Sequence, residues 1–229
     1  MTASEFDDVW VVVPVFNEAP VLEAVLDGLT AVFPWVCVVD DASDDGSGGI
    51  ARCFADRGVR LLTHPVNLGQ GAALQTGFEY VLGDPSMARV VTFDADGQHV
   101  VDDAVRLARR LTAGFDVVLG SRFVARKASP MGWPKRSLLR LAVAYTRVST
   151  RLKVSDTHNG LRALNRQAVG LMNLTQSGMA HATEILERIK QRGLRYTEEP
   201  VEIHYSAYSR AKGQPLLNAV NILVDLLVK

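Results

Sequence analysis

The chain has 229 residues and a mass of 25.0 kDa, which fits one medium-sized domain. Its composition is 48% hydrophobic and 22% charged, with a mean hydropathy of +0.08, which excludes a disordered or fibrous chain. The net charge is zero, yet residues 1–121 hold 18 acidic and 7 basic side chains, whereas residues 122–229 hold 7 acidic and 18 basic ones. The charge is therefore divided between the two halves of the chain.

The first half alternates between predicted strands and predicted helices. Val9–Val15 is a continuous, mostly β-branched run, typical of a strand buried on both faces. The elements that follow are a helix from Pro20, strand Val36–Val39, helix 50–57, strand Val59–Thr63, helix 70–82, strand Arg89–Phe93, helix 100–113 and strand Asp116–Leu119. This alternation predicts an α/β fold with a doubly wound, mainly parallel sheet flanked by helices, whose ligands bind outside the carboxyl ends of the strands.

The second half changes character at residue 122. Residues 122–155 contain nine basic side chains, no acidic one, and interleaved apolar residues that include Trp133. This composition is typical of an element that approaches an anionic membrane surface, although an ordinary basic helix packed on the core would show it too. A helix at His181–Arg192, an alternating strand near Val201–Tyr205 and an apolar tail at Pro215–Lys229 complete the prediction.

The sequence contains no predicted secretory leader and no predicted membrane span. Its acidic start lacks the basic n-region of a signal peptide, and no uncharged apolar run reaches the roughly 18 residues that cross a bilayer. Cys37 and Cys53 fall in a predicted strand and a predicted helix, without a disulfide framework or a CxxC site. We therefore expect two buried thiols and a cytoplasmic location.

The most informative motif is VTFDADGQ (91–98), an apolar strand that runs into acidic residues. Buried carboxylates without partners are costly, so acidic residues at this place need a reason. If the extended geometry continues, Asp94, Asp96 and Gln98 face the same side. Three oxygen-bearing side chains on one face suit a hard divalent cation that bridges phosphates. An acidic turn at the end of a strand is the alternative interpretation.

Three further loops place polar residues after strands. In VPVFNE (13–18), Phe16 could stack on a base beside hydrogen-bonding Asn17 and Glu18, or the segment is a plain strand–turn–helix junction. In VVDDASDDG (38–46), two carboxylates could accept from a base or a ribose, or the segment is an Asx-rich turn that caps the next helix. In NLGQG (67–71), the glycines indicate a tight backbone approach at a helix N-terminus, because the spacing of a dinucleotide fingerprint is absent.

These motifs occur in an order that resembles a known family. VPVFNE, VVDDASDDG, NLGQG, DADGQH (94–99) and GSR (120–122) are followed by DTHNGLRALNR (156–166), ATEI (182–185) and YSAYSRAKGQ (205–214). The set resembles family 2 glycosyltransferases of the GT-A fold, and within them the polyprenyl- or dolichyl-phosphate sugar synthases. The resemblance covers about residues 9–214, which is nearly the whole chain.

The resemblance implies a role for each matching residue. The donor nucleotide-diphospho-sugar would contact Pro14, Phe16, Glu18, Val39, Asp41, Gly69, Gln70, Asp94 and Ala95. Mg²⁺ or Mn²⁺ would be held by Asp94, Asp96 and Gln98. The catalytic set would be Asp96, Arg122, Arg162 and Lys212, with the arginines as phosphate clamps and the lysine closing over the donor. Arg162 could instead form a surface salt bridge, and Glu184 could either pair with one of the two arginines or take part in catalysis.

The implied reaction is the inverting transfer of a sugar to a polyprenyl phosphate. A divalent cation and the arginines would stabilise the departing nucleoside diphosphate, and the ionised lipid phosphate would attack without a general base. Ser206 stands where eukaryotic-type mannose synthases carry an arginine, six residues before Lys212. This departure favours UDP-HexNAc or UDP-glucose, as in actinobacterial polyprenyl-phospho-N-acetylgalactosaminyl synthases, over the alternative donor GDP-mannose.

The resemblance also implies a setting for the reaction. We expect a single GT-A catalytic domain over residues 1–214 and an apolar helix over residues 215–229 that docks on the membrane, on a small membrane protein or on another copy of the chain. The expected location is peripheral, on the inner face of the cell membrane. No nucleic-acid partner is expected, because the acidic first half would repel a duplex. A family 2 transferase with a non-lipid acceptor and a sugar-nucleotide-binding module without turnover are the alternatives.

Overall fold

The computed structural model describes residues 5–124, 152–157, 159–178, 180–204 and 208. In these residues seven strands form one sheet in the order β3-β2-β1-β4-β6-β5-β7. The strands are β1 (Val9–Val15), β2 (Trp35–Asp40), β3 (Val59–Thr63), β4 (Arg89–Thr92), β5 (Val117–Ser121), β6 (Arg162–Asn165) and β7 (Tyr196–Pro200). The basic segment and the apolar tail lie almost entirely outside the described residues.

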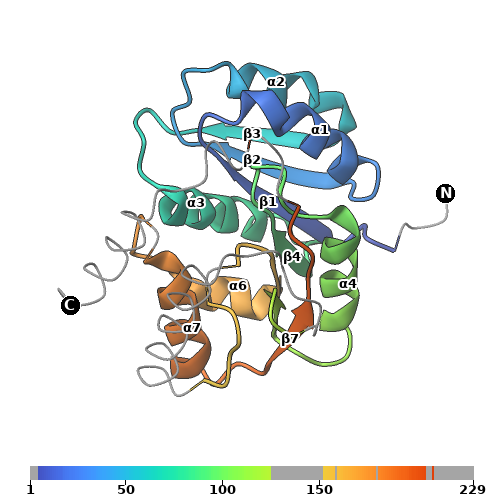
Figure 1. Cartoon of the computed structure of the whole chain (residues 1–229), viewed down its shortest axis with the longest axis vertical. Helices are drawn as coiled ribbons and strands as arrows, with labels where there is room; N and C mark the ends of the chain where they lie inside the picture. The colour runs from blue at the N-terminus through green and yellow to red at the C-terminus, as the bar shows by residue number, and fades with distance from the viewer. Residues whose placement is uncertain (1–4, 125–151, 158, 179, 205–207, 209–229) are drawn as a thin grey trace.

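Helices cover both faces of the sheet (Figure 1). They are α1 (Ala19–Thr30), α2 (Ser47–Cys53), α3 (Gln70–Leu82), α4 (Val101–Leu111), α6 (Arg166–Met172) and α7 (His181–Gln191). Because side chains alternate along a strand, Val11 and Val13 of β1 pack with α1, α2 and α4, while Val12 packs with α3. Each face of the sheet therefore has its own apolar core.

The sheet is mixed, and its one reversed strand positions the site. β1, β2, β3 and β4 run parallel, as do β5 and β7, but β6 is antiparallel to both β4 and β5. The register sets Arg162, at the start of β6, opposite Thr92 at the end of β4 and Leu119 of β5. The amino end of β6 thus meets the carboxyl ends of its neighbours.

The predicted fold class is confirmed, with local corrections. Helix 50–57 is replaced by α2 and a short 3₁₀ turn at Ala55–Arg57. The strand predicted near Val201–Tyr205 is wrong, because the strand is β7 at Tyr196–Pro200 and only Ile203 forms an isolated bridge beyond it. β6 and α6 were not predicted. Cys37 is buried as expected, whereas Cys53 is exposed because it lies at the solvent side of α2.

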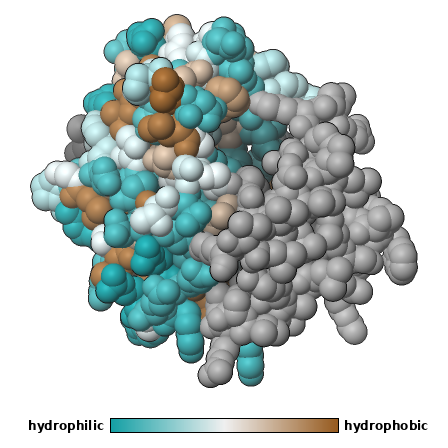
Figure 2. Space-filling view, turned by 90° about the vertical axis from the view of Figure 1, so that its left-hand side faces the viewer, coloured by the Kyte–Doolittle hydropathy of each residue, from teal (hydrophilic) through white to brown (hydrophobic). Residues whose placement is uncertain are grey.

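The surface seen in Figure 2 is mostly hydrophilic in its described part, with small separate hydrophobic patches. The large apolar side chains that are exposed among the described residues are Phe16, Val66, Leu68, Tyr80 and Val124. None of the described helices combines the length and the hydrophobicity needed to cross a membrane.

Candidate active site

The loops after β1 and β2 are joined by hydrogen bonds. The Asn17 N–H donates to Ser43 Oγ at 3.0 Å, and the Asp44 N–H donates to Asn17 Oδ1 at the same distance. Asn17 adopts a left-handed φ of 54°, which an asparagine tolerates well. Asp45 Oδ2 accepts from the Ala19 N–H at 2.9 Å and so supports the first turn of α1. Within the loop after β2, Asp40 Oδ1 accepts from the Ser43 N–H and Asp45 Oδ1 from the Ser47 N–H, each at 3.0 Å, so the Asx-rich turn is present, although no side chain caps α2 at its N-cap residue Gly46.

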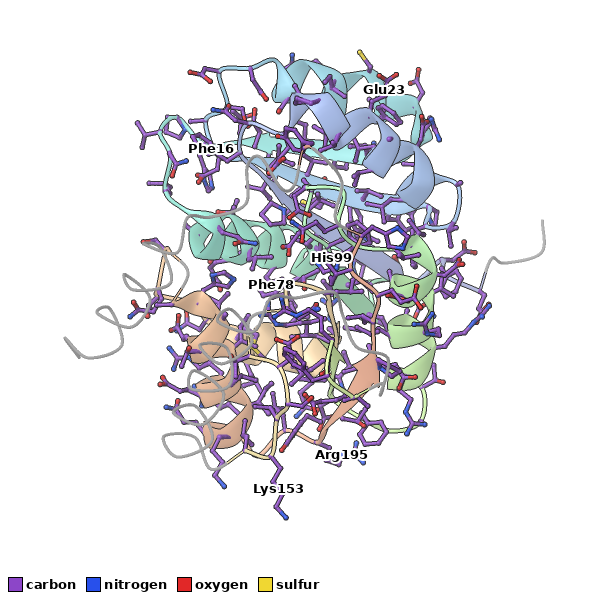
Figure 3. All side chains as sticks on the ribbon, in the orientation of Figure 1. Phe16, Glu23, Phe78, His99, Lys153 and Arg195 are labelled. Carbon is purple, nitrogen blue, oxygen red and sulfur yellow. The ribbon has the colours of Figure 1, made fainter. Side chains whose placement is uncertain are left out.

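The predicted base and ribose contacts lie around these loops. Pro14 and Val39 are register partners in the β1–β2 pair, and the Phe16 side chain is 44% exposed at the edge of the molecule (Figure 3). The Tyr208 hydroxyl contacts Glu18 Oε2 at 2.9 Å and Asn17 O at 3.2 Å, so the Tyr208 side chain reaches the loop after β1. Lys212 lies outside the described residues.

Asp41 organises the loop that leads to α3. Its carboxylate accepts from the backbone N–H of Leu68 at 2.8 Å and of Gly69 at 2.7 Å, and lies 2.7 Å from His64 Nδ1. The other ring nitrogen of His64 lies 2.9 Å from Thr76 Oγ1. Asp41 therefore holds the 64–69 loop in place, and its contact with a nucleotide stays a prediction.

The glycines of NLGQG allow a close backbone approach, as expected. A Cβ on Gly69 would lie 2.4 Å from Ser177 O, and one on Gly71 would lie 1.9 Å from Gln176 O. The Gly71 N–H donates to Ser177 O at 2.7 Å. The start of α3 therefore packs against the 176–178 backbone, and a larger residue would separate the two segments.

The acidic loop after β4 is a turn rather than an extended strand. β4 ends at Thr92, and Gly97 has a φ of 72°, so the extended geometry assumed for residues 94–98 is wrong. Asp94 Oδ1 accepts from Gln70 Nε2 at 2.9 Å, and Asp94 Oδ2 lies 3.1 Å from His99 Nε2. Asp96 Oδ1 accepts from the Gln98 N–H at 3.0 Å. Ala95, between the two aspartates, is buried.

The two aspartates have opposite electrostatic surroundings. Burial alone would raise the pKa of Asp94, but His99, Arg162 and His181 outweigh it and lower that pKa below the usual range. Burial and the neighbouring Asp94 charge raise the pKa of Asp96 to about 6. Asp96 thus carries a negative charge that its surroundings do not compensate.

This donor set fits a divalent cation that also binds a ligand. Asp94 and Asp96 are two mutually repelling carboxylates, and Gln98 follows them in the same turn. Nowhere in the described part of the chain do three or more His, Cys, Asp or Glu side chains gather closely enough to hold a metal ion by themselves. A hard cation at Asp94 and Asp96 would therefore take its remaining oxygens from phosphate and water, which is the usual arrangement for Mg²⁺.

The Arg122 guanidinium is held by Asp156. Its Nε and Nη2 donate to Asp156 Oδ2 and Oδ1 at 2.6 and 2.7 Å, in a bidentate pair. Glu198 of β7 supports the Asp156 loop, because its Oε1 accepts from the Ser155 N–H at 2.7 Å and the Asp156 N–H at 3.3 Å. The role of Arg122 as a phosphate clamp stays a prediction, and the structure adds the residue that orients it.

Arg162 is buried, so a surface salt bridge is excluded for it. The residue is 3% exposed, has no salt bridge with a described residue, and its Nη1 has no hydrogen-bond partner among them. Burial lowers its pKa, while the charges of Asp94 and Asp156 act in the opposite direction. A buried guanidinium with an unpartnered nitrogen fits an anionic ligand.

Glu184 pairs with neither arginine of the predicted site. Its carboxylate accepts from the N–H of Thr175 and Gln176 at 3.0 and 2.9 Å, and from Arg188 Nη2 at 3.1 Å. Glu184 therefore anchors the 175–176 loop to α7. An arginine does pair with Glu184, as expected, but it is Arg188 on the next turn of α7 and not Arg122 or Arg162.

Sequence reasoning missed several residues of the site. His99 and Asp156 lie inside motifs that were recognised, but neither was given a role there. Gly160 was missed as well, although a Cβ at this position would lie 2.0 Å from Asp94 Oδ2. The motifs could have pointed to these residues, because each of them lies within a few positions of a predicted site residue in the sequence.

The comparisons with known proteins agree with this geometry. The sequence pattern of glycosyl transferase family 2 matches residues 10–170. The fold and the acidic turn thus define an α/β transferase domain, and the chain belongs to glycosyl transferase family 2. It is accordingly a glycosyltransferase.

Relatives with curated names include three lipid-phosphate sugar transferases. The chain is 30% identical over 202 residues to the polyprenol monophosphomannose synthase of Mycolicibacterium smegmatis, covering 83% of this chain and 75% of that one. It is 31% identical over 199 residues to the undecaprenyl-phosphate mannosyltransferase of Micrococcus luteus, covering 83% and 81%. It is 28% identical over 238 residues to the undecaprenyl-phosphate 4-deoxy-4-formamido-L-arabinose transferase of Aeromonas hydrophila, covering 99% and 68%.

Solved structures share the fold. Glucosyl-3-phosphoglycerate synthase from Mycobacterium tuberculosis, crystallised with Mn²⁺, UDP-glucose and glycerol 3-phosphate, superposes with a TM-score of 0.66 at 19% identity. The match covers 97% of this chain and 79% of that one. At this identity the likeness establishes the arrangement of strands and helices alone.

Proposed function

We propose that the enzyme transfers a sugar from a nucleoside diphosphate to a polyprenyl phosphate, with inversion at the anomeric carbon. The observation that carries this proposal is the β4–β6 register, which sets the buried Arg162 beside the strand that leads to Asp94 and Asp96. A pair of carboxylates next to a guanidinium with one unpartnered nitrogen can hold a cation and a phosphate side by side. The names of the relatives supply the acceptor class.

The residues of the site then have separate tasks. Asp94, Asp96 and Gln98 would hold Mg²⁺ or Mn²⁺, which when bound neutralises the donor diphosphate. Arg162 and Arg122 would bind phosphate oxygens of the donor or the lipid, and Lys212 would close over the donor. Positioning and charge neutralisation would supply most of the rate, because the ionised lipid phosphate needs no general base.

The nucleotide would lie over the loops after β1 and β2. Phe16, exposed at that edge, would stack on the base, with Pro14 and Val39 beneath it and Glu18 beside the ribose. Asp41 would act from the end of β2, Gly69 and Gln70 from the 64–70 loop, and Ala95 from the acidic turn. The Glu18 carboxylate already contacts the Tyr208 hydroxyl, so donor binding would rearrange that contact.

Two donors deserve a direct comparison. Ser206 in place of an arginine favours a UDP-sugar such as UDP-HexNAc or UDP-glucose. GDP-mannose is the second candidate, because two of the relatives are named for mannose transfer to a polyprenyl phosphate. A lipid acceptor also accounts for the basic segment 122–155 and the apolar helix 215–229 as elements that dock on the inner face of the membrane, on a small membrane protein or on another copy.

The test is a transfer assay with short-chain polyprenyl phosphate. Radiolabelled UDP-HexNAc, UDP-glucose and GDP-mannose are compared with Mg²⁺, with Mn²⁺ and with EDTA. We expect label in the organic phase from one donor, in the presence of a cation only, and none from the folded Asp96→Asn variant. Label that stays in the aqueous phase with every donor, or transfer that persists in EDTA, would overturn the proposal.

A further inference from the structure

The His99 ring is buried beside the acidic turn. Its side chain, labelled near the middle of the view in Figure 3, is 3% exposed, and its Nε2 lies 3.1 Å from Asp94 Oδ2. A carboxylate can only accept, so the Nε2 atom carries the hydrogen of this bond. The imidazole therefore donates to one oxygen of Asp94.

Packing alone does not account for an imidazole at this position. The ring stands edge-on to Phe93, with centroids 5.5 Å apart and an interplanar angle of 68°, as two apolar aromatic rings would. Its Nδ1 is buried and has no hydrogen-bond partner among the described residues. Burial of an unpartnered polar atom is unfavourable, so an apolar ring would pack at lower cost. What the imidazole adds is the Nε2–H that Asp94 accepts.

The rest of the surroundings hold Asp94 from the other sides. Gln70 Nε2 donates to Asp94 Oδ1 at 2.9 Å. The Gly160 backbone lies against the carboxylate, since a Cβ there would come within 2.0 to 2.4 Å of its three terminal atoms. The Thr92 hydroxyl fixes Gly160 by donating to its carbonyl oxygen at 2.6 Å. Together with the His99 hydrogen bond, these contacts hold the Asp94 carboxylate in one orientation.

We propose that His99 is a positioning residue, which orients the Asp94 carboxylate toward the divalent cation through the Nε2–H···Oδ2 hydrogen bond. This inference rests on the proposed function, because it assumes a cation at Asp94 and Asp96. Partners that orient a ligating carboxylate raise metal affinity by keeping the ligand in its binding geometry. His99 acts through Asp94 and does not touch the cation.

The surroundings of His99 allow clean substitutions. Residue 99 borders an open pocket of about 300 Å³ whose lining includes Val21, Val25, Phe93 and Gly97, so a phenylalanine has room. The backbone is held independently of the side chain, because Gln98 O accepts from the His204 N–H at 2.9 Å and residue 99 bridges Ile203. His99→Phe removes the donor, and His99→Gln restores an N–H at comparable reach. His204→Gln is the matched control, because that histidine is exposed.

The experiment titrates each full-length variant with Mn²⁺ in the presence of UDP and follows free Mn²⁺ by electron paramagnetic resonance. We expect His99→Phe to weaken Mn²⁺ binding by about tenfold or more, and His99→Gln and His204→Gln to bind within about threefold of the parent. Thermal unfolding without metal shows whether each variant is folded.

The outcomes separate this inference from the function on which it rests. If the parent protein binds Mn²⁺ with UDP and folded His99→Phe binds equally well, His99 does not position Asp94. If Gln weakens binding as much as Phe, the donated hydrogen bond is not the cause, and the inference is again overturned. If the parent protein itself binds no Mn²⁺, the metal site of the proposed function fails first.

Discussion

Arg122 and Asp156 form a bidentate ion pair across 34 residues of sequence, with two nitrogen–oxygen distances of 2.6 and 2.7 Å. A 2.6 Å contact between Ser121 Oγ and Ser155 Oγ lies beside it. The two ends of the basic segment therefore meet beside the end of β5. This relationship ties the proposed lipid-facing segment to the end of β5, where the chemistry is proposed.

Removing one partner of this pair should destabilise the fold. Asp156 is 4% exposed and the Arg122 side chain 15%, so Asp156→Ala leaves a half-buried Arg122 charge poorly compensated. We expect the free energy of unfolding in urea to fall by about 3 kcal/mol. Asp27→Ala is the control, because the Asp27–Arg57 pair is exposed and should contribute less than about 1 kcal/mol. Equal losses in the two variants would contradict the buried character of the Arg122 pair.

Gly160 should tolerate no side chain next to Asp94. The Cβ of Gly160→Ala would lie 2.0 Å from Asp94 Oδ2, so the carboxylate must move. We expect Mn²⁺ affinity in the presence of UDP to fall about tenfold. Gly170→Ala, in α6, meets nothing within 4 Å and should leave Mn²⁺ affinity unchanged while stabilising the helix by about 0.5 kcal/mol. Parent-like metal binding by Gly160→Ala would show that Asp94 needs no such space.

Substitutions of Arg162 and Arg166 should have different effects, the first on sugar transfer and the second on the stability of the fold. Arg162 Nη1 is buried without a partner among the described residues. Arg166 instead donates to the carbonyl oxygens of Leu82, the last residue of α3, and of Asp84 and Met87 in the segment that follows. Arg162→Leu should keep or increase the free energy of unfolding while transfer falls about 100-fold. Arg166→Leu should lower the free energy of unfolding by about 2 kcal/mol, because three carbonyls lose their donor. A turnover number and KM unchanged in Arg162→Leu would remove Arg162 from the site.

Glu184 should stabilise the fold in a pH-dependent way. Burial raises the pKa of this carboxyl, but the N–H groups of Gln176 and Thr175, the Thr175 hydroxyl and Arg188 outweigh it, so the pKa is lowered from 4.5. A lowered folded-state pKa means that the ionised form contributes stability above pH 4.5, and that this stability is lost as the pH falls through the folded-state pKa. Urea unfolding should therefore show Glu184→Gln less stable than the parent at pH 7.

The difference between the Glu184→Gln variant and the parent should shrink as the pH falls below 4.5. Glu23→Gln, at an exposed position of α1, should change the free energy of unfolding by less than about 0.5 kcal/mol at either pH. A Glu184→Gln difference that stays constant from pH 7 down to about pH 3 would indicate lost packing rather than a lost charge.

Most of the sheet could be predicted from contiguous sequence. Val9–Val15 and the apolar runs after it carry the β-branched, two-face pattern of buried strands, and β1 and β3 have the predicted bounds. β6 and β7 could not be predicted in this way, because RALN is too short to show a period and YTEEP has no apolar alternation. Only pairing with β4 and β5 makes strands of them.

The candidate site, like the sheet, could be predicted only in part. Contiguous residues are enough to show which loops carry polar groups, because each motif is a few consecutive residues after a strand. The contacts of those groups follow from the folded structure: His64 lies beside Asp41, Gln70 and His99 bind Asp94, and Asp156 binds Arg122. Propensity and periodicity act between near neighbours in the chain, whereas the Asp41, Gln70 and Arg122 contacts join residues 23 or more positions apart that the folded sheet brings together. His99 lies only five residues from Asp94, and the turn between them brings its ring back to the carboxylate.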